Sequence, residues 1–236
     1  MDLLLDFSMR ESVFYSEASY LRDSLALLAF DDAGNTKDRE QVSKIRSLNN
    51  AAFKNVWHID YSSCKYDIYN KILHHAFLGE GGDLEVPDWT FTENESEFNG
   101  HKVKKATGKY MGRNWTVWYT EEIPVPSGPW LLWGCPGLII YAIDEDKMFN
   151  FYVLGEEEIE RNRWETLKAN YVSHNATSQR MTIREEEAIK CRLNRDLEYT
   201  MQLMGAATTD NNGNAINTIS KRDFEPLIPE SYWKKK

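Results

Sequence analysis

Cysteine is scarce in this chain of 236 residues, and its three cysteines, Cys64, Cys135 and Cys191, stand far apart. No Cys-x-x-Cys pair occurs, so neither a zinc knuckle nor a thioredoxin-type redox pair is supported. One disulfide with one free thiol is compatible with this number, and the spacing gives no connectivity. We expect at least one buried, unreactive thiol.

Long apolar runs are also missing. No stretch of about 18 apolar residues is present, so we expect no transmembrane span. The opening residues, MDLLLDFSMRESVFYS, place Asp2 and Asp6 where a signal peptide needs a basic region and an apolar core. On these grounds alone the chain would be assigned to the cytoplasm.

Positive charge is in deficit, because 28 Lys and Arg face 37 Asp and Glu and leave a formal net charge of -9. Such a surface repels phosphate backbones, so we expect no nucleic-acid partner.

Recognisable catalytic and cofactor motifs are absent as well. The sequence has no phosphate-binding loop and no Gly-x-Ser-x-Gly elbow. His74 and His75 are neighbours, and on a strand they point to opposite faces, which argues against chelation of one metal ion. We therefore expect no cofactor, no metal site and no enzymatic activity, although a hydrolase using scattered Asp, Glu and His stays an alternative.

The middle of the chain is rich in strand and turn signals. The Asn99–Gly100 pair predicts a hairpin turn, and residues 111–114 predict a second one. The segments WTVWYT, LIIYAID and MFNFYVLG read as further strands of a meander, and residues 1–7 and 12–15 as two strands at the start. One antiparallel sheet explains this pattern best.

Helical patterns lie on both sides of these strands. Ser16 or Ser19 caps a helix that carries Leu21, Leu25 and Leu28 on one face, and residues 42–53 form a second helix. A helix also follows Thr182, and residues 207–236 read as a flexible loop and tail. We predict one α+β domain over residues 1–236, with a curved antiparallel sheet and flanking helices.

Aromatic side chains are the strongest remaining signal. Trp115, Trp118, Trp130 and Trp133 lie close together, and the last two belong to an apolar loop rich in proline and glycine. These residues pack in a core, or they line a pocket or an exposed contact surface. Pro129, which fixes the approach of the chain, and the apolar strand that follows favour the core for Trp130. Gly134 and Pro136, which hold the backbone open, favour a surface or pocket for Trp133.

The stretch NGHKVKKATGKYMGRNWTVWYTEEIPVPSGPWLLWGCPGLIIYAID resembles the signature region of the GLPGLI protein family. RESVFYS near the start is similar to the first third of that family. Two positions depart from the family pattern: Cys135 replaces a leucine, and Val103 replaces a cysteine. No disulfide is therefore carried over.

The resemblance implies a bacterial protein that is exported to the periplasm or cell surface and has no characterised activity. It also implies a half-barrel-like sheet similar to that of periplasmic lipoprotein carriers. Family members have a leading strand before the segment that matches residues 1–15. We therefore expect residues 1–7 to pair in the main sheet and to leave an edge open for a homodimer.

Three functions stay open. The first is a non-enzymatic module that binds an apolar small molecule or a protein segment in an aromatic groove. The second is an envelope interaction protein that contacts a partner through the Trp and Pro loop. The third is the hydrolase. For Arg113 we expect either a solvated turn residue or a guanidinium that stacks on an aromatic residue of the apolar loop or pairs with Glu121 or Glu122. The candidate binding residues are Arg113, Trp115, Trp118, Tyr119, Trp130 and Trp133.

Overall fold

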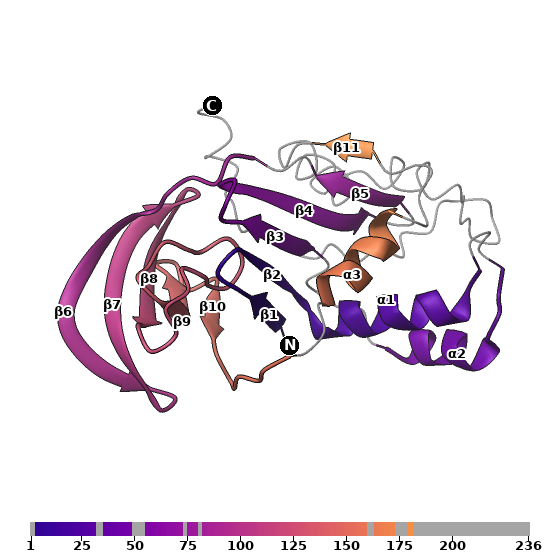
Figure 1. Ribbon diagram of the computed structural model, residues 1–236, viewed down its shortest axis with the longest axis horizontal. Helices are drawn as coiled ribbons and strands as arrows, with labels where there is room; N and C mark the ends of the chain where they lie inside the picture. Colours follow the sequence, from indigo (N-terminus) through magenta and orange to yellow (C-terminus); the bar gives the residue numbers. More distant parts are fainter. Residues whose placement is uncertain are drawn as a thin grey trace, which may run out of the picture.

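The computed structural model describes residues 3–31, 35–48, 55–72, 75–79, 82–159, 163–172 and 179–181. Over these ranges the chain forms two β-sheets with helices beside one of them (Figure 1). The helices are α1 (Glu17–Ala29), α2 (Arg39–Ser47) and α3 (Arg163–Val172). The predicted α+β class is confirmed, and strands dominate.

The first sheet has six strands in the order β1-β2-β3-β4-β5-β11. Adjacent strands in this sheet pair antiparallel, except that β5 and β11 are parallel. The strands are β1 (Leu3–Phe7), β2 (Glu11–Ser16), β3 (Val56–Asp60), β4 (Lys65–Ile72), β5 (His75–Gly79) and β11 (Gln179–Met181). As predicted, the first strand pairs within a sheet, and it lies at its edge.

The second sheet is an antiparallel meander of five strands in the order β10-β9-β8-β7-β6. Figure 1 shows β6 and β7 bending together in a long arc. The strands are β6 (Asp88–Phe98), β7 (His101–Tyr110), β8 (Arg113–Thr120), β9 (Leu138–Asp144) and β10 (Asn150–Tyr152).

Both predicted hairpin turns are confirmed. Asn99 and Gly100 have φ of 50° and 83°, and Met111 and Gly112 have φ of 46° and 81°. Two successive residues with positive φ match the right-handed twist of the flanking strands, which is why Asn-Gly is favoured at such a turn.

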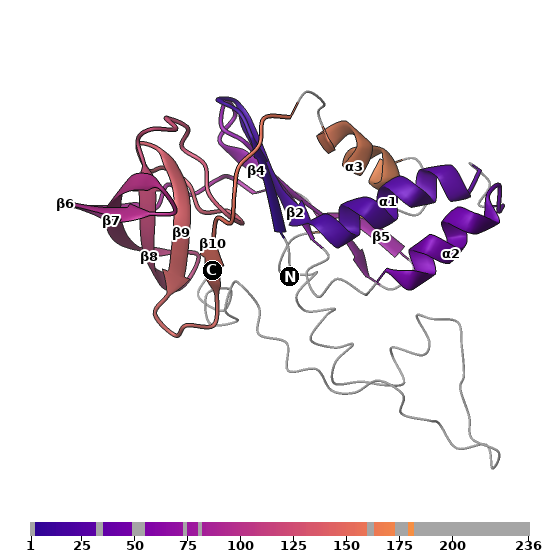
Figure 2. The same ribbon diagram turned by 90° about the horizontal axis from the view of Figure 1, so that it is seen from below.

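The six-stranded sheet lies between the five-stranded sheet and the helices (Figure 2). Side chains alternate across it: Phe14 packs toward the five-stranded sheet, whereas Val13 and Tyr15 pack with Trp164 of α3. A strand buried on both faces shows little alternation in polarity. The run VFY in β2 has this character, and both of its faces are covered.

The helix starts are set by caps. The Ser16 hydroxyl accepts a hydrogen bond from the Ser19 backbone N–H, as predicted for α1, and the Asp38 carboxylate accepts from the backbone N–H groups of Glu40 and Gln41. The second helix therefore starts before the predicted residue 42. An acidic cap within a polar loop gave that start, while the prediction followed only the apolar residues.

The strands fall into two sheets where the sequence favoured one. Local alternation predicts that a segment is a strand, but the choice between sheets depends on pairing over long sequence distances. The strand predicted around residues 148–155 is also shorter, since only Asn150–Tyr152 pairs with β9.

The cysteine prediction holds for Cys135, a free and buried thiol whose pKa burial raises to about 12. Cys64 is free and exposed. Cys191, His74, the helix predicted after Thr182 and the tail 207–236 lie outside the described residues. In the part of the chain that is described, no helix is long and apolar enough to cross a bilayer.

Candidate functional site

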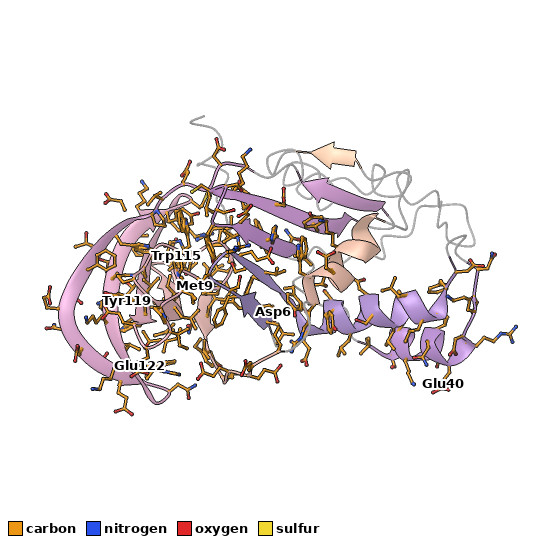
Figure 3. The ribbon with its side chains drawn as sticks, in the orientation of Figure 1. Asp6, Met9, Glu40, Trp115, Tyr119 and Glu122 are labelled. Atoms are coloured by element: carbon orange, nitrogen blue, oxygen red, sulfur yellow. The ribbon has the colours of Figure 1, made fainter. Side chains whose placement is uncertain are left out.

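The six candidate residues divide by burial. Arg113, Trp115, Tyr119 and Trp130 are buried, while Trp118 and Trp133 are partly exposed. Trp115 lies among the side chains of the five-stranded sheet (Figure 3) and belongs to the core cluster between the sheets. An open aromatic surface can therefore include only Trp118 and Trp133 from this set.

The apolar loop between β8 and β9 packs into the core between the sheets. Trp130, Leu131 and Leu132 are all at most 1% exposed. Part of its backbone is paired within the loop, since Leu132 N–H donates to Pro129 O at 3.0 Å and Gly134 N–H donates to Pro126 O at 3.1 Å. These bonds lower the cost of burying so apolar a loop in the core.

Trp133 connects this loop to the segment before β6. Its indole N–H donates to Glu85 O at 2.9 Å, and its own carbonyl accepts from the Trp89 indole at 2.8 Å. Its ring stacks on Tyr61 with centroids 6.0 Å apart. Trp133 is thus partly exposed, while its polar group and one ring face are already in use.

Arg113 is buried in an ion pair and is not a solvated turn residue. Its Nη1 lies 3.0 Å from Asp144 Oδ2, and its guanidinium lies 4.8 Å from the centroid of the Phe149 ring. The predicted partners Glu121 and Glu122 instead contact Lys104 and His101. The expected pairing with Glu121 or Glu122 is wrong, because Trp115 pairs with Asp144 and the start of β8, where Arg113 lies, is therefore beside the end of β9. The ring beside the guanidinium is Phe149, which follows β9 and does not belong to the apolar loop.

Trp118 belongs to an aromatic row on the other face of the five-stranded sheet. Its ring stacks on Tyr141 at 4.6 Å, and Tyr141 stacks on Phe98 at 5.3 Å. Lys105 Nζ lies 5.7 Å from the Trp118 centroid. We call Phe98, Trp118 and Tyr141 the outer aromatic row; all three are partly exposed.

Strand register extends this surface to the sheet edge. Tyr141 pairs with Tyr152 of β10, so both side chains are expected on one face, and Tyr152 is 57% exposed. Leu154, two residues further, is 74% exposed. Paired aromatic residues on adjacent strands stabilise a sheet, yet an open row of them also offers contact area.

The outer aromatic row packs on buried side chains of the same face of the sheet. Phe98 and Trp118 pack on a small buried cluster formed by Val103, Val125, Leu138 and Ile140. A register shift in β9 opposite Trp118 accommodates Ile140. Such a bulge re-aims side chains on its strand.

A histidine and two carboxylates lie where β7 begins. His101 Nδ1 is 2.9 Å from Glu122 Oε2, and its Nε2 is 3.7 Å from Glu156 Oε1. The hydrogen bond from His101 lowers the pKa of Glu122. Among the described residues no three His, Cys, Asp or Glu side chains are grouped in a way that suits a metal ion.

The sequence predictions missed Phe98, Tyr141 and Tyr152. The available signal was the alternation along β8 and β9, which puts Trp118 and one residue of each neighbouring strand on the same face. What the sequence lacks is the register that selects Tyr141 and Tyr152 as those residues.

A family model and solved structures are similar to parts of this chain. A family model described as a protein of unknown function (Porph_ging) matches residues 83–141, which include β6 to β8 and the apolar loop. That finding is compatible with an uncharacterised bacterial protein, and the resemblance to the GLPGLI family stays a prediction. No curated protein matches the chain.

Two solved structures are similar in part, "Structure of PNGF-II in C2 space group" and "Structure of PNGF-II in P21 space group". Each is 12% identical, with TM-scores of 0.48 and 0.47. The match covers 79% of this chain but only 29% of PNGF-II. A likeness of this size supports no statement on function.

Proposed function

We propose that the protein is a non-enzymatic interaction module that binds a protein partner through the outer aromatic row. The observation that carries this proposal is the stack of Phe98, Tyr141 and Trp118, which stays partly exposed on the face of a sheet. Export to the periplasm or cell surface, as the resemblance to GLPGLI proteins implies, is part of the proposal.

The form of this surface favours a protein segment over a small apolar ligand. Rings that stack face to face present their edges outward, so the row is a ridge supported from below and not a pocket that surrounds a molecule. Protein interfaces combine an aromatic centre with a polar rim. Here Lys105 borders Trp118, and the His101–Glu122 pair lies near the strand ends.

The apolar loop between β8 and β9 is less suited to partner contact than the sheet. Trp130 is 1% exposed, and Trp133 already uses its N–H and one ring face within the fold. The contact surface is therefore proposed on the sheet and not on the loop.

A photo-crosslinking experiment tests the proposal. p-Benzoylphenylalanine replaces the exposed Tyr152, and as a matched control it replaces Val86, which is 75% exposed and precedes the start of β6, whereas Phe98 of the row ends that strand. After irradiation in the native host, we expect a discrete adduct with another protein from position 152 only. Trp118→Ala should remove that adduct, because an aromatic anchor at an interface contributes about 2 kcal/mol or more.

Two results would contradict a specific partner surface: no adduct at position 152, or equal adducts at positions 152 and 86. An adduct of twice the chain mass would replace the partner by a second copy and would support the homodimer instead.

A further inference from the structure

The core between the sheets contains three tryptophans from three separate segments. Trp57 comes from β3, Trp115 from β8 and Trp130 from the loop before β9. Trp130 is central, since its centroid lies 5.9 Å from that of Trp57 and 5.8 Å from that of Trp115. All three are at most 4% exposed.

None of these three indole N–H groups has an acceptor among the described residues. The contrast with two other tryptophans is direct: Trp89 and Trp133 each donate to a backbone carbonyl at 2.8 and 2.9 Å. Buried donors nearly always have a partner, in the protein or in ordered water. Three exceptions in one cluster therefore call for a physical cause.

The face of a neighbouring aromatic ring can accept from the indole N–H of Trp57 or Trp130, but not from that of Trp115. An indole N–H lies in the plane of its ring, so it reaches the face of a neighbour only when the two rings are nearly perpendicular. Trp57 and Trp130 meet at 82°, which allows such a contact. Trp115 meets Trp130 at 34° and Phe151 at 22°, and neither ring presents its face to the Trp115 N–H.

The surroundings favour an uncharged acceptor. The buried charges beside Trp115 are already paired with each other: Asp144, its cross-strand neighbour, binds the Arg113 guanidinium at 3.0 Å and accepts from the Phe149 N–H. An anion in such a site would lose its hydration without a cation in return. A neutral oxygen atom accepts from an indole N–H without that cost.

We propose that the core between the two sheets binds an uncharged oxygen acceptor at the Trp115 indole N–H. The acceptor belongs either to an ordered water or to a small neutral molecule carrying a hydroxyl or carbonyl group. This internal site is separate from the outer aromatic row and does not depend on the function proposed for it.

The test removes the donor and keeps the ring. β-(3-Benzothienyl)alanine has sulfur in place of the indole N–H, and it is introduced at position 115 and, as control, at position 133, whose donor has a known acceptor. If an acceptor is bound, loss of the Trp115 donor lowers the melting temperature by about 2 to 4 °C, as expected for one hydrogen bond in a chain of this size. The fall in melting temperature at position 133 gives the reference value for losing one indole hydrogen bond whose acceptor is known.

A melting temperature that does not fall in the variant at position 115 overturns the proposal. A donor without any acceptor destabilises the fold, so its removal at position 115 would leave the melting temperature unchanged or raise it.

Mass spectrometry of the folded wild-type protein separates the two sources. Extra mass that is released on unfolding identifies a small molecule, while a fall in melting temperature without extra mass assigns the acceptor to water. Should the variant at position 115 not fold, cross-relaxation between the wild-type Trp115 indole proton and bound water, or the extra mass, supports the proposal. The absence of both overturns it.

Discussion

Trp118 and Trp130 show what residue type alone does not decide. Both belong to one aromatic-rich stretch, yet Trp118 is partly exposed on a strand and Trp130 is 1% exposed in a loop. Trp130 even adopts φ of 57°, a region that bulky residues avoid. Packing against Trp57 and Trp115 outweighs that local cost. The local sequence favoured the core for Trp130, as the structure confirms, but it could not identify these two partners.

At the same scale, Asp144 provides a sharp prediction. Asp144→Ala leaves Arg113 buried without its main partner and removes the acceptor for the Phe149 N–H at 2.8 Å. We expect a loss of about 3 to 5 kcal/mol in the free energy of unfolding, measured with urea. Asp146 lies 3.7 Å from the same guanidinium but is 76% exposed, so Asp146→Ala should cost about 0 to 1 kcal/mol. Equal losses for the two variants would contradict this assignment.

Among the elements, those with strong local signals were predictable. The meander and its two tight turns follow from alternation and from Asn-Gly and Met-Gly, and α1 follows from its cap. The early start of α2 and the division into two sheets were not predicted. The first depends on Asp38 in a polar loop, and the second on pairing between distant segments.

The approach of the apolar loop to β8 gives a prediction at the element scale. A Cβ at Gly137 would lie 1.9 Å from the Thr120 carbonyl oxygen, a backbone atom that cannot turn away. Gly137→Ala should therefore cost about 1 to 3 kcal/mol in urea unfolding. Nothing lies within 4 Å of a Cβ at Gly155, so Gly155→Ala is the matched control and should leave stability unchanged or slightly higher. A tolerant Gly137 would show that the loop moves away from β8.

The packing of α3 on the six-stranded sheet involves a titratable group. The His58 ring stacks on Trp164 at 4.6 Å, and its Nε2 lies 3.0 Å from Glu11 Oε2. Burial opposes protonation, but the hydrogen bonds and charges of Asp67 and Glu11 outweigh it and raise the pKa of His58.

A raised pKa means that folding favours the protonated histidine. This contribution to stability is complete below the unfolded value of about 6.5 and is lost as the pH rises through the higher folded value. We expect wild type to lose its advantage over His58→Gln in urea unfolding as the pH rises above about 6.5. Glu11→Gln combined with Asp67→Asn leaves burial as the main influence on the pKa of His58, so in that background the dependence should disappear or reverse. With both carboxylates present, an advantage of His58 that grew with pH would refute the assignment.

At the scale of the whole molecule, the two sheets share their largest buried cluster, which lies between them. The largest buried cluster joins Phe14, Trp57 and Ile68 of one sheet to Trp115 and Val117 of the other, with Trp130 between them. The second face of each sheet then serves a different purpose. The second face of the six-stranded sheet packs on helices (Figures 1 and 2). The second face of the five-stranded sheet carries the outer aromatic row.

The central position of Trp130 also has a consequence for the order of folding. Each sheet closes mainly through neighbours in the chain, which is fast, whereas Trp57 and Trp130 meet across a long stretch of sequence. Contacts of such separation form after the entropy of a large loop has been lost. We therefore expect docking of the two sheets to follow formation of each sheet, so that a nascent chain exposes Trp57, Trp115 and Trp130 until the sheets meet.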